Sequence, residues 1–108
     1  MLKVYLSHPV ENIYTDEEHE AYMSKMNKLL KLLLGNIEFE ITDSRMDDFD
    51  CDKYRRYDVA MFGETIKLMS EADVIVFDEG WSRTHGCAIQ YEIAKRFHLP
   101  YIDLAVQA

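Results

Sequence analysis

Residues 72–78 read ADVIVFD, in which the four apolar residues Val74 to Phe77 stand between two aspartates. An uninterrupted apolar run of this length suits a strand that is covered on both faces and does not suit an exposed one. The sequence therefore predicts a buried central strand over 74–77.

Three elements are expected before this strand. Strand formers at 3–6 predict a first strand. Thr15 begins a capping box, apolar residues then recur at helical intervals, and Gly35 stands where helices commonly end, so a helix is predicted over 16–34. Apolar and polar residues alternate from 37 to 42, which is typical of a half-exposed strand at a sheet edge.

Two more helices and a strand are expected around and after the central strand. A helix is predicted from Asp58 to about Ala72, a polar loop over 78–86, another helix over 87–98 and a last strand over 100–104. The side chains expected to point inward are Val59, Phe62, Ile66 and Met69 in the first of these helices and Ala88, Tyr91, Ala94 and Phe97 in the other.

This alternation of strands and helices predicts parallel βαβ units with right-handed crossovers. The expected fold class is α/β: a small three-layer sandwich with a parallel four- to five-stranded sheet in the order 2-1-3-4, flavodoxin- or Rossmann-like, in one domain over residues 1–108. Ligands of such sheets bind beyond the carboxyl ends of the strands, at the point where the strand order reverses. We expect the loops 7–14 and 78–86 to meet at that point.

The charge balance narrows the expected partners. The 108 residues include 12 Lys plus Arg and 20 Asp plus Glu, which gives a formal net charge of −8. Binding to nucleic-acid polymers or to anionic membranes depends on clustered cations, so neither partner is expected. Small molecules and other proteins remain as the expected partners.

Neither a cofactor nor a metal is expected. The sequence has four glycines and neither the GxGxxG nor the GxxxxGK[ST] pattern of phosphate-binding loops. Cys51 and Cys87 lack zinc-ligand spacing, and the first ten residues are too polar for a signal peptide, so we expect reduced thiols in a soluble, cytoplasmic protein. One aspartate-rich stretch lacks the glycine and the glutamate of a calcium loop; its acids are Asp47, Asp48, Asp50 and Asp52.

The crevice between the first and third strands is expected to collect side chains that suit a polar ligand with a ring. These candidates are Tyr5, Ser7, His8, Tyr14, Asp78, Glu79, Trp81, Arg83, His85 and Glu92. The last helix, preceded by Gly86, adds free backbone N–H groups that can bind an anion. Trp81 suits either stacking on a base or a contact between subunits.

Three segments carry a family resemblance: VYLSHPV at 4–10, ADVIV at 72–76 and THGCAIQYEIAK at 84–95. Their sequences and their order resemble the nucleoside 2-deoxyribosyltransferase family and its relatives, which include deoxynucleoside 5′-monophosphate N-glycosidases. The resemblance extends over nearly the whole chain. It implies cleavage or transfer at the N-glycosidic bond of a nucleoside or nucleoside 5′-monophosphate.

The same resemblance implies catalytic roles for two residues. Glu92 would attack the sugar C1′, or stabilise the positive charge that develops there as the base departs, and Tyr5 would orient this glutamate. From the residues alone, an exposed glutamate on a helix surface and a tyrosine packed in the sheet are the alternatives.

The resemblance also implies contacts with the substrate. The loop residues Ser7, His8 and Pro9 would approach the base or the sugar, and Asp58 would bind the nucleobase. An exposed loop histidine and an N-terminal helix cap are the alternatives for His8 and Asp58.

The sequence departs from the family at Gly86, where transferases have an acid and the monophosphate glycosidases have a serine. Asp78 or Glu79 is then the candidate acid, and Arg83, Thr84 and His85 are the candidates for holding a phosphate together with the helix N–H groups. Relatives are homo-oligomers, so a dimer or larger assembly is expected. Gly86 favours the alternative of a catalytically silent nucleotide-binding or sequestering module, and an oligomeric interaction protein is a further alternative.

Overall fold

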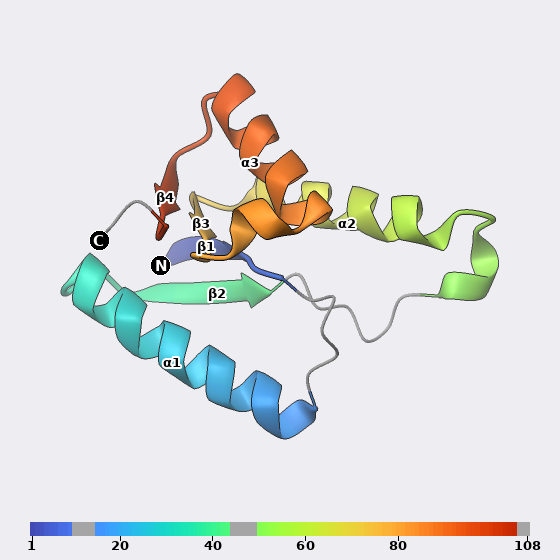
Figure 1. Cartoon of the computed structure of the whole chain (residues 1–108). Helices are drawn as coiled ribbons and strands as arrows, with labels where there is room; N and C mark the ends of the chain where they lie inside the picture. The colour runs from blue at the N-terminus through green and yellow to red at the C-terminus, as the bar shows by residue number, and fades with distance from the viewer. Residues whose placement is uncertain (10–14, 44–49, 106–108) are drawn as a thin grey trace.

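The apolar run at 74–77 forms β3 (Val74–Phe77), which lies inside a four-stranded parallel sheet (Figure 1). β1 (Leu2–Ser7) lies between β2 (Phe39–Asp43) and β3, and β4 (Tyr101–Asp103) pairs with the other side of β3. The order is β2-β1-β3-β4. The predicted α/β fold and strand order are confirmed.

The computed structural model describes residues 1–9, 15–43 and 50–105. The helices in this part of the chain are α1 (Asp16–Leu34), α2 (Tyr57–Glu71) and α3 (His85–Arg96), with short 3-10 turns at η1 (Cys51–Lys53) and η2 (Trp81–Arg83). No helix of these residues combines the length and the apolar composition needed to cross a membrane.

Helices cover both faces of the sheet, with α1 on one face and α2 and α3 on the other (Figure 1). Alternate residues of β1 point to opposite faces. Core side chains on the α1 face are Val4, Leu6, Met26, Leu30 and Val76. Those on the other face are Tyr5, Met69, Ile75, Phe77 and Ala94. The two layers of helices make β1 and β3 a strand pair buried on both faces, as the apolar run predicts.

The ends of α1 follow the local sequence. The Thr15 hydroxyl accepts a hydrogen bond from the backbone N–H of Glu18 at 3.1 Å, which satisfies one of the free donors at the helix start. Gly35 ends the helix at φ 64°, a left-handed conformation that glycine adopts without steric cost. The observed helix has the predicted bounds.

The inward faces of α2 and α3 differ in part from the prediction. Val59 is 63% exposed and Phe97 is 73% exposed, so neither belongs to the core. Met69 and Ala94 are buried as predicted, and the other buried residues are Thr65 in α2 and Cys87 and Gln90 in α3. Two of these are polar, and hydrogen bonds between the helices make their burial possible.

Leu30 offers a test of the α1 face. Its side chain is fully buried, so Leu30→Ala should lower the free energy of unfolding by about 2–5 kcal/mol, because it removes apolar contacts and leaves a cavity. Leu32 on the same helix is 83% exposed, and Leu32→Ala should change stability by less than about 0.5 kcal/mol. Urea denaturation followed by circular dichroism measures both, and equal effects would contradict the assignment of the buried face.

Candidate functional site

A cavity of about 530 Å³ lies between the first turns of α2 and α3, next to the end of β1. Its volume is in the range of small-molecule sites. Phe62, Met61 and Ile89 give it apolar walls, and its polar lining residues include His8, Thr65, Thr84 and Gln90. The cavity thus lies by the carboxyl end of β1 and by the start of α3, the helix that follows β3 in the chain.

Gln90 ties three elements together beneath this cavity. The Ser7 hydroxyl donates to Gln90 Oε1 at 2.6 Å, and Gln90 Nε2 donates to Thr65 Oγ1 at 2.8 Å and to the Tyr5 hydroxyl at 3.3 Å. All four residues are buried. Both amide hydrogens of Gln90 are used, so the floor of the cavity is neutral and fixed.

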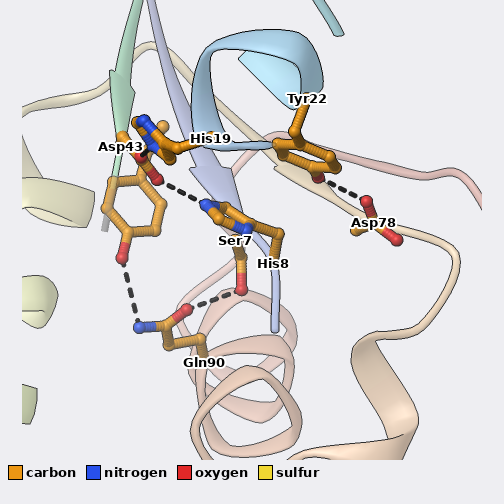
Figure 2. Close-up of polar contacts among 8 residues, drawn as sticks. Ser7, His8, His19, Tyr22, Asp43, Asp78 and Gln90 are labelled. Atoms are coloured by element: carbon orange, nitrogen blue, oxygen red, sulfur yellow. Dashed lines mark hydrogen bonds and ion pairs between the residues drawn. The ribbon is translucent and has the colours of Figure 1, made fainter. Parts of the chain in front are cut away.

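A second polar cluster joins the ends of β1 and β2 to the first turns of α1 (Figure 2). His8 Nε2 lies 2.5 Å from Asp43 Oδ1, and His19 Nε2 bonds Asp43 Oδ2. Burial alone would raise the pKa of Asp43, but hydrogen bonds and charge interactions with His8 and His19 outweigh it and lower that pKa to about 2. Asp43 is therefore a carboxylate at neutral pH.

Tyr22 covers His8 and links this cluster to the end of β3. The rings of Tyr22 and His8 lie 4.7 Å apart between centroids, and the Tyr22 hydroxyl donates to Asp78 Oδ2. Asp78 Oδ1 also accepts from the backbone N–H of Gly80 at 3.0 Å. Asp78 thus holds α1 and its own loop, and it does not line the cavity.

Five of the predicted substrate-binding residues line the cavity. They are His8, Asp58, Thr84, His85 and Gly86. Ser7 and Tyr5 lie beneath it through their bonds to Gln90. Pro9, Trp81 and Arg83 are not among the residues that line it. The predicted candidate Tyr14 and the aspartates Asp47 and Asp48 lie outside the described residues.

Glu92 lies on the surface of α3. Its side chain is 52% exposed, and its Oε1 accepts a hydrogen bond from Arg96 Nε at 2.7 Å. This hydrogen bond and the positive charge of Arg96 lower the pKa of Glu92. Residues two apart on a helix point in nearly opposite directions, and it is Gln90 that faces the cavity floor. The arrangement agrees with the surface alternative for Glu92.

Trp81 belongs to an aromatic cluster on the β4 side of the sheet. Its ring stacks on Tyr91 at 3.9 Å between centroids, and its indole N–H donates to Asp103 Oδ1 at 2.9 Å. Hydrogen bonding to Tyr101, burial and nearby negative charge raise the pKa of Tyr91 to about 12. One face of Trp81 is therefore already occupied by Tyr91.

Asp58 does not cap α2. The N-cap residue is Arg56, which makes no side-chain cap hydrogen bond, and Asp58 Oδ1 instead accepts from the adjacent Val59 N–H at 2.9 Å. Asp58 is exposed at the rim of the cavity, where its Oδ1 lies 3.7 Å from Arg56 Nε.

The residues that the sequence did not single out are Asp43, His19, Thr65 and Gln90. The helical spacing of Gln90 with Cys87 and Ala94 is a signal that the three share a face, whereas Asp43 has no signal beyond its place at the end of β2. Across the described ranges, no group of three His, Cys, Asp or Glu side chains is placed to hold a metal ion.

Comparison with known proteins adds no relative. Neither the models of known protein families nor the curated proteins include a match to this chain. The chemistry of the site is therefore argued from its own residues.

The low pKa of Asp43 makes stability depend on pH. A carboxyl whose pKa is lower in the folded state than its ordinary 3.8 stabilises the fold above about pH 4, and this contribution disappears as the pH falls toward 2. The two pKa values correspond to about 2 kcal/mol. We expect the free energy of unfolding at pH 6 to be higher for wild type than for Asp43→Asn. This difference should fall by about 2 kcal/mol as the pH is lowered.

Urea denaturation at a series of pH values between 6 and 2 measures this difference. Asp58→Asn is the matched control, because Asp58 is an exposed aspartate away from the histidine cluster. Parallel stability curves for wild type and Asp43→Asn would contradict the prediction.

Proposed function

We propose that this protein binds a nucleoside or nucleoside 5′-monophosphate in the cavity between α2 and α3 without cleaving it. The observation that carries the proposal is the neutral amide of Gln90 in the cavity floor, together with the outward position of Glu92. Stabilising an oxocarbenium-like sugar requires a carboxylate close to C1′, which an amide cannot replace.

The cavity has the chemistry that a nucleoside needs. The Phe62 ring and the aliphatic Met61 and Ile89 side chains provide apolar surface for the faces of a base. The polar lining residue His85 can meet a hydroxyl of the sugar. A ligand of this kind is small enough for a volume of about 530 Å³.

A 5′-phosphate would fit at the start of α3. Thr84, the N-cap residue, makes no side-chain cap hydrogen bond, and its Oγ1 is buried without a partner. The backbone N–H groups and the positive end of the helix dipole favour an anion at this place. Arg83 is exposed and does not line the cavity, so these neutral groups would carry the recognition.

Cleavage or transfer at the N-glycosidic bond is the second candidate function. The motif at 84–95 favours it, because it carries Glu92 at the position that the resemblance assigns to the nucleophile. In that case Glu92 would have to leave Arg96 and reach the sugar of a bound nucleoside.

A second copy of the chain would close the cavity. Tyr57, Val59 and Ile89 line its rim and are 52%, 63% and 49% exposed, which is a concentration of apolar surface typical of contacts between subunits. We therefore include a homo-oligomer in the proposal. Cys87 is a buried free thiol, which fits a reducing compartment, so the proposed location is the cytoplasm.

Ligand binding is tested by titrating the protein with ribo- and deoxynucleosides and their 5′-monophosphates in a calorimeter. Phe62→Ala should weaken binding about tenfold, because a ring contact with a base is lost. Phe97→Ala is the matched control: Phe97 is 73% exposed and does not line the cavity, so affinity should be unchanged. Equal effects of the two variants would contradict binding in this cavity.

Chromatography of the same mixtures separates binding from cleavage. We expect the intact ligand to be recovered after incubation with wild type and with Glu92→Gln. Release of free base by wild type that Glu92→Gln abolishes would establish the second candidate function instead.

Self-association is tested at the rim. Val59→Asp places a charge in the exposed apolar surface and should shift the protein toward the monomer in sedimentation velocity experiments, because an unpaired charge is costly to bury. Ser70→Asp, on an exposed position of the same helix outside the rim, should leave the distribution unchanged. A monomer at every wild-type concentration would contradict the proposed assembly.

A further inference from the structure

The hydroxyl of Thr65 takes part in two hydrogen bonds at once. Its Oγ1 donates to the backbone carbonyl of Phe62 at 2.6 Å and accepts from Gln90 Nε2 at 2.8 Å. A carbonyl oxygen can only accept, so the single hydroxyl proton is committed to Phe62. A donor of Gln90 must then face Thr65, which leaves Gln90 Oε1 for the Ser7 hydroxyl. Thr65 therefore determines which way round the buried amide of Gln90 lies.

The bond between Thr65 and Gln90 joins α2 to α3 one helical turn beneath the walls of the cavity. Residues three and four positions apart on a helix lie on the same face, about one turn from each other. The residues in these earlier positions, before Thr65 in α2 and before Gln90 in α3, all line the cavity: Met61, Phe62, Gly86 and Cys87. The bond is therefore placed to set the distance between the two walls.

Phe62 is attached to α3 through its ring as well as through its main chain. A Cβ atom on Gly86 would lie 3.7 Å from Cε1 of the Phe62 ring, which is an ordinary van der Waals distance, so the ring lies beside the first turn of α3. The carbonyl of the same residue is held by Thr65, whose other bond goes to Gln90. Thr65 and Gln90 are 6% and 4% exposed, so water does not readily replace the bond between them.

We propose that Thr65 is a positioning residue of the cavity, whose hydroxyl holds α2 at a fixed distance from α3 and keeps the Phe62 ring in place for a ligand to stack on it. Thr65 acts through Phe62 and Gln90 and needs no contact of its own with the ligand. The class of ligand rests on the proposed function, whereas the two hydrogen bonds of Thr65 belong to the free protein. Walls that are held in place before binding reduce the entropy lost when a ligand binds.

Two variants of Thr65 separate the hydroxyl from the shape of the side chain. Thr65→Val keeps the shape and removes the hydroxyl, whereas Thr65→Ser keeps the hydroxyl and removes a methyl group. In calorimetric titrations with adenosine, guanosine, cytidine, uridine and their 5′-monophosphates, we expect about tenfold weaker binding by Thr65→Val and less than a twofold change in Thr65→Ser. A role in packing alone would reverse this order, so weaker binding by Thr65→Ser than by Thr65→Val would overturn the proposal.

Ser70 provides a matched control on the same helix. Its hydroxyl donates to the carbonyl of Lys67 at 2.6 Å, a bond of the same span and length as the one from Thr65 to Phe62. Ser70 is exposed and does not line the cavity. Ser70→Ala should therefore change the affinity less than twofold, and a loss equal to that of Thr65→Val would overturn the proposal.

NMR spectra of the Gln90 side-chain amide in the free protein separate this proposal from the function on which it rests. The two Nε2 hydrogens should exchange slowly with solvent in wild type and in Thr65→Ser, because both are donated within a buried cluster. In Thr65→Val their exchange should be at least about tenfold faster, because one acceptor is lost.

Unchanged exchange in Thr65→Val overturns the proposal whether or not a nucleoside binds. If exchange responds as expected and no nucleoside binds, the proposed function fails and the positioning of Gln90 and Phe62 by Thr65 stands. If Thr65→Val does not fold, the wild-type spectrum decides, and rapid exchange of the Gln90 amide hydrogens there overturns the proposal.

Discussion

The parallel pairing of β1 with β2 on one side and β3 on the other is the interaction on which the rest of the structure depends. Its register pairs Leu6 with both Asp43 and Val76, so the carboxyl ends of three strands lie at one edge. Every polar group of the candidate site projects from this edge or from the helices that follow it. A shift of one residue in β1 would exchange the faces of Tyr5, Leu6 and Ser7 and would destroy the core and the site together.

Two hydrogen-bonded clusters lie at the edge formed by the carboxyl ends of the strands. The Gln90 cluster joins β1 to α2 and α3, whereas the Asp43 cluster joins β1 and β2 to α1. The Gln90 cluster is neutral, and the Asp43 cluster has a partly buried charge. Their meeting point is the pair Ser7 and His8, adjacent residues whose side chains serve opposite layers of the molecule. The two clusters therefore attach both layers of helices to the edge of the sheet that lies next to the cavity.

The sequence was sufficient where the structure follows local rules. The bounds of α1 follow from Thr15 and Gly35, and β3 follows from four apolar residues that need burial on both sides. The strand order also followed, because it requires only an edge strand and a central strand. Each of these signals lies within a few residues of the element that it determines.

Prediction was weaker where burial depends on partners far along the chain. A buried glutamine is costly unless its amide finds donors and acceptors, and the partners of Gln90 come from β1 and α2. Local pattern therefore favoured Val59 and Phe97 as inward residues, and the family resemblance gave Glu92 more weight than Gln90. Asp43 was similarly hidden, because its significance comes from two histidines in separate elements.

The partners of Gln90 have a consequence for how this site can change. All three are hydroxyl groups, which rotate and can donate as readily as they accept. A glutamate has the shape of a glutamine, and the same three hydroxyls could turn toward its oxygens without any movement of the backbone. A single substitution, Gln90→Glu, replaces one amide nitrogen by an oxygen and would convert the neutral floor of this cavity into an anionic one.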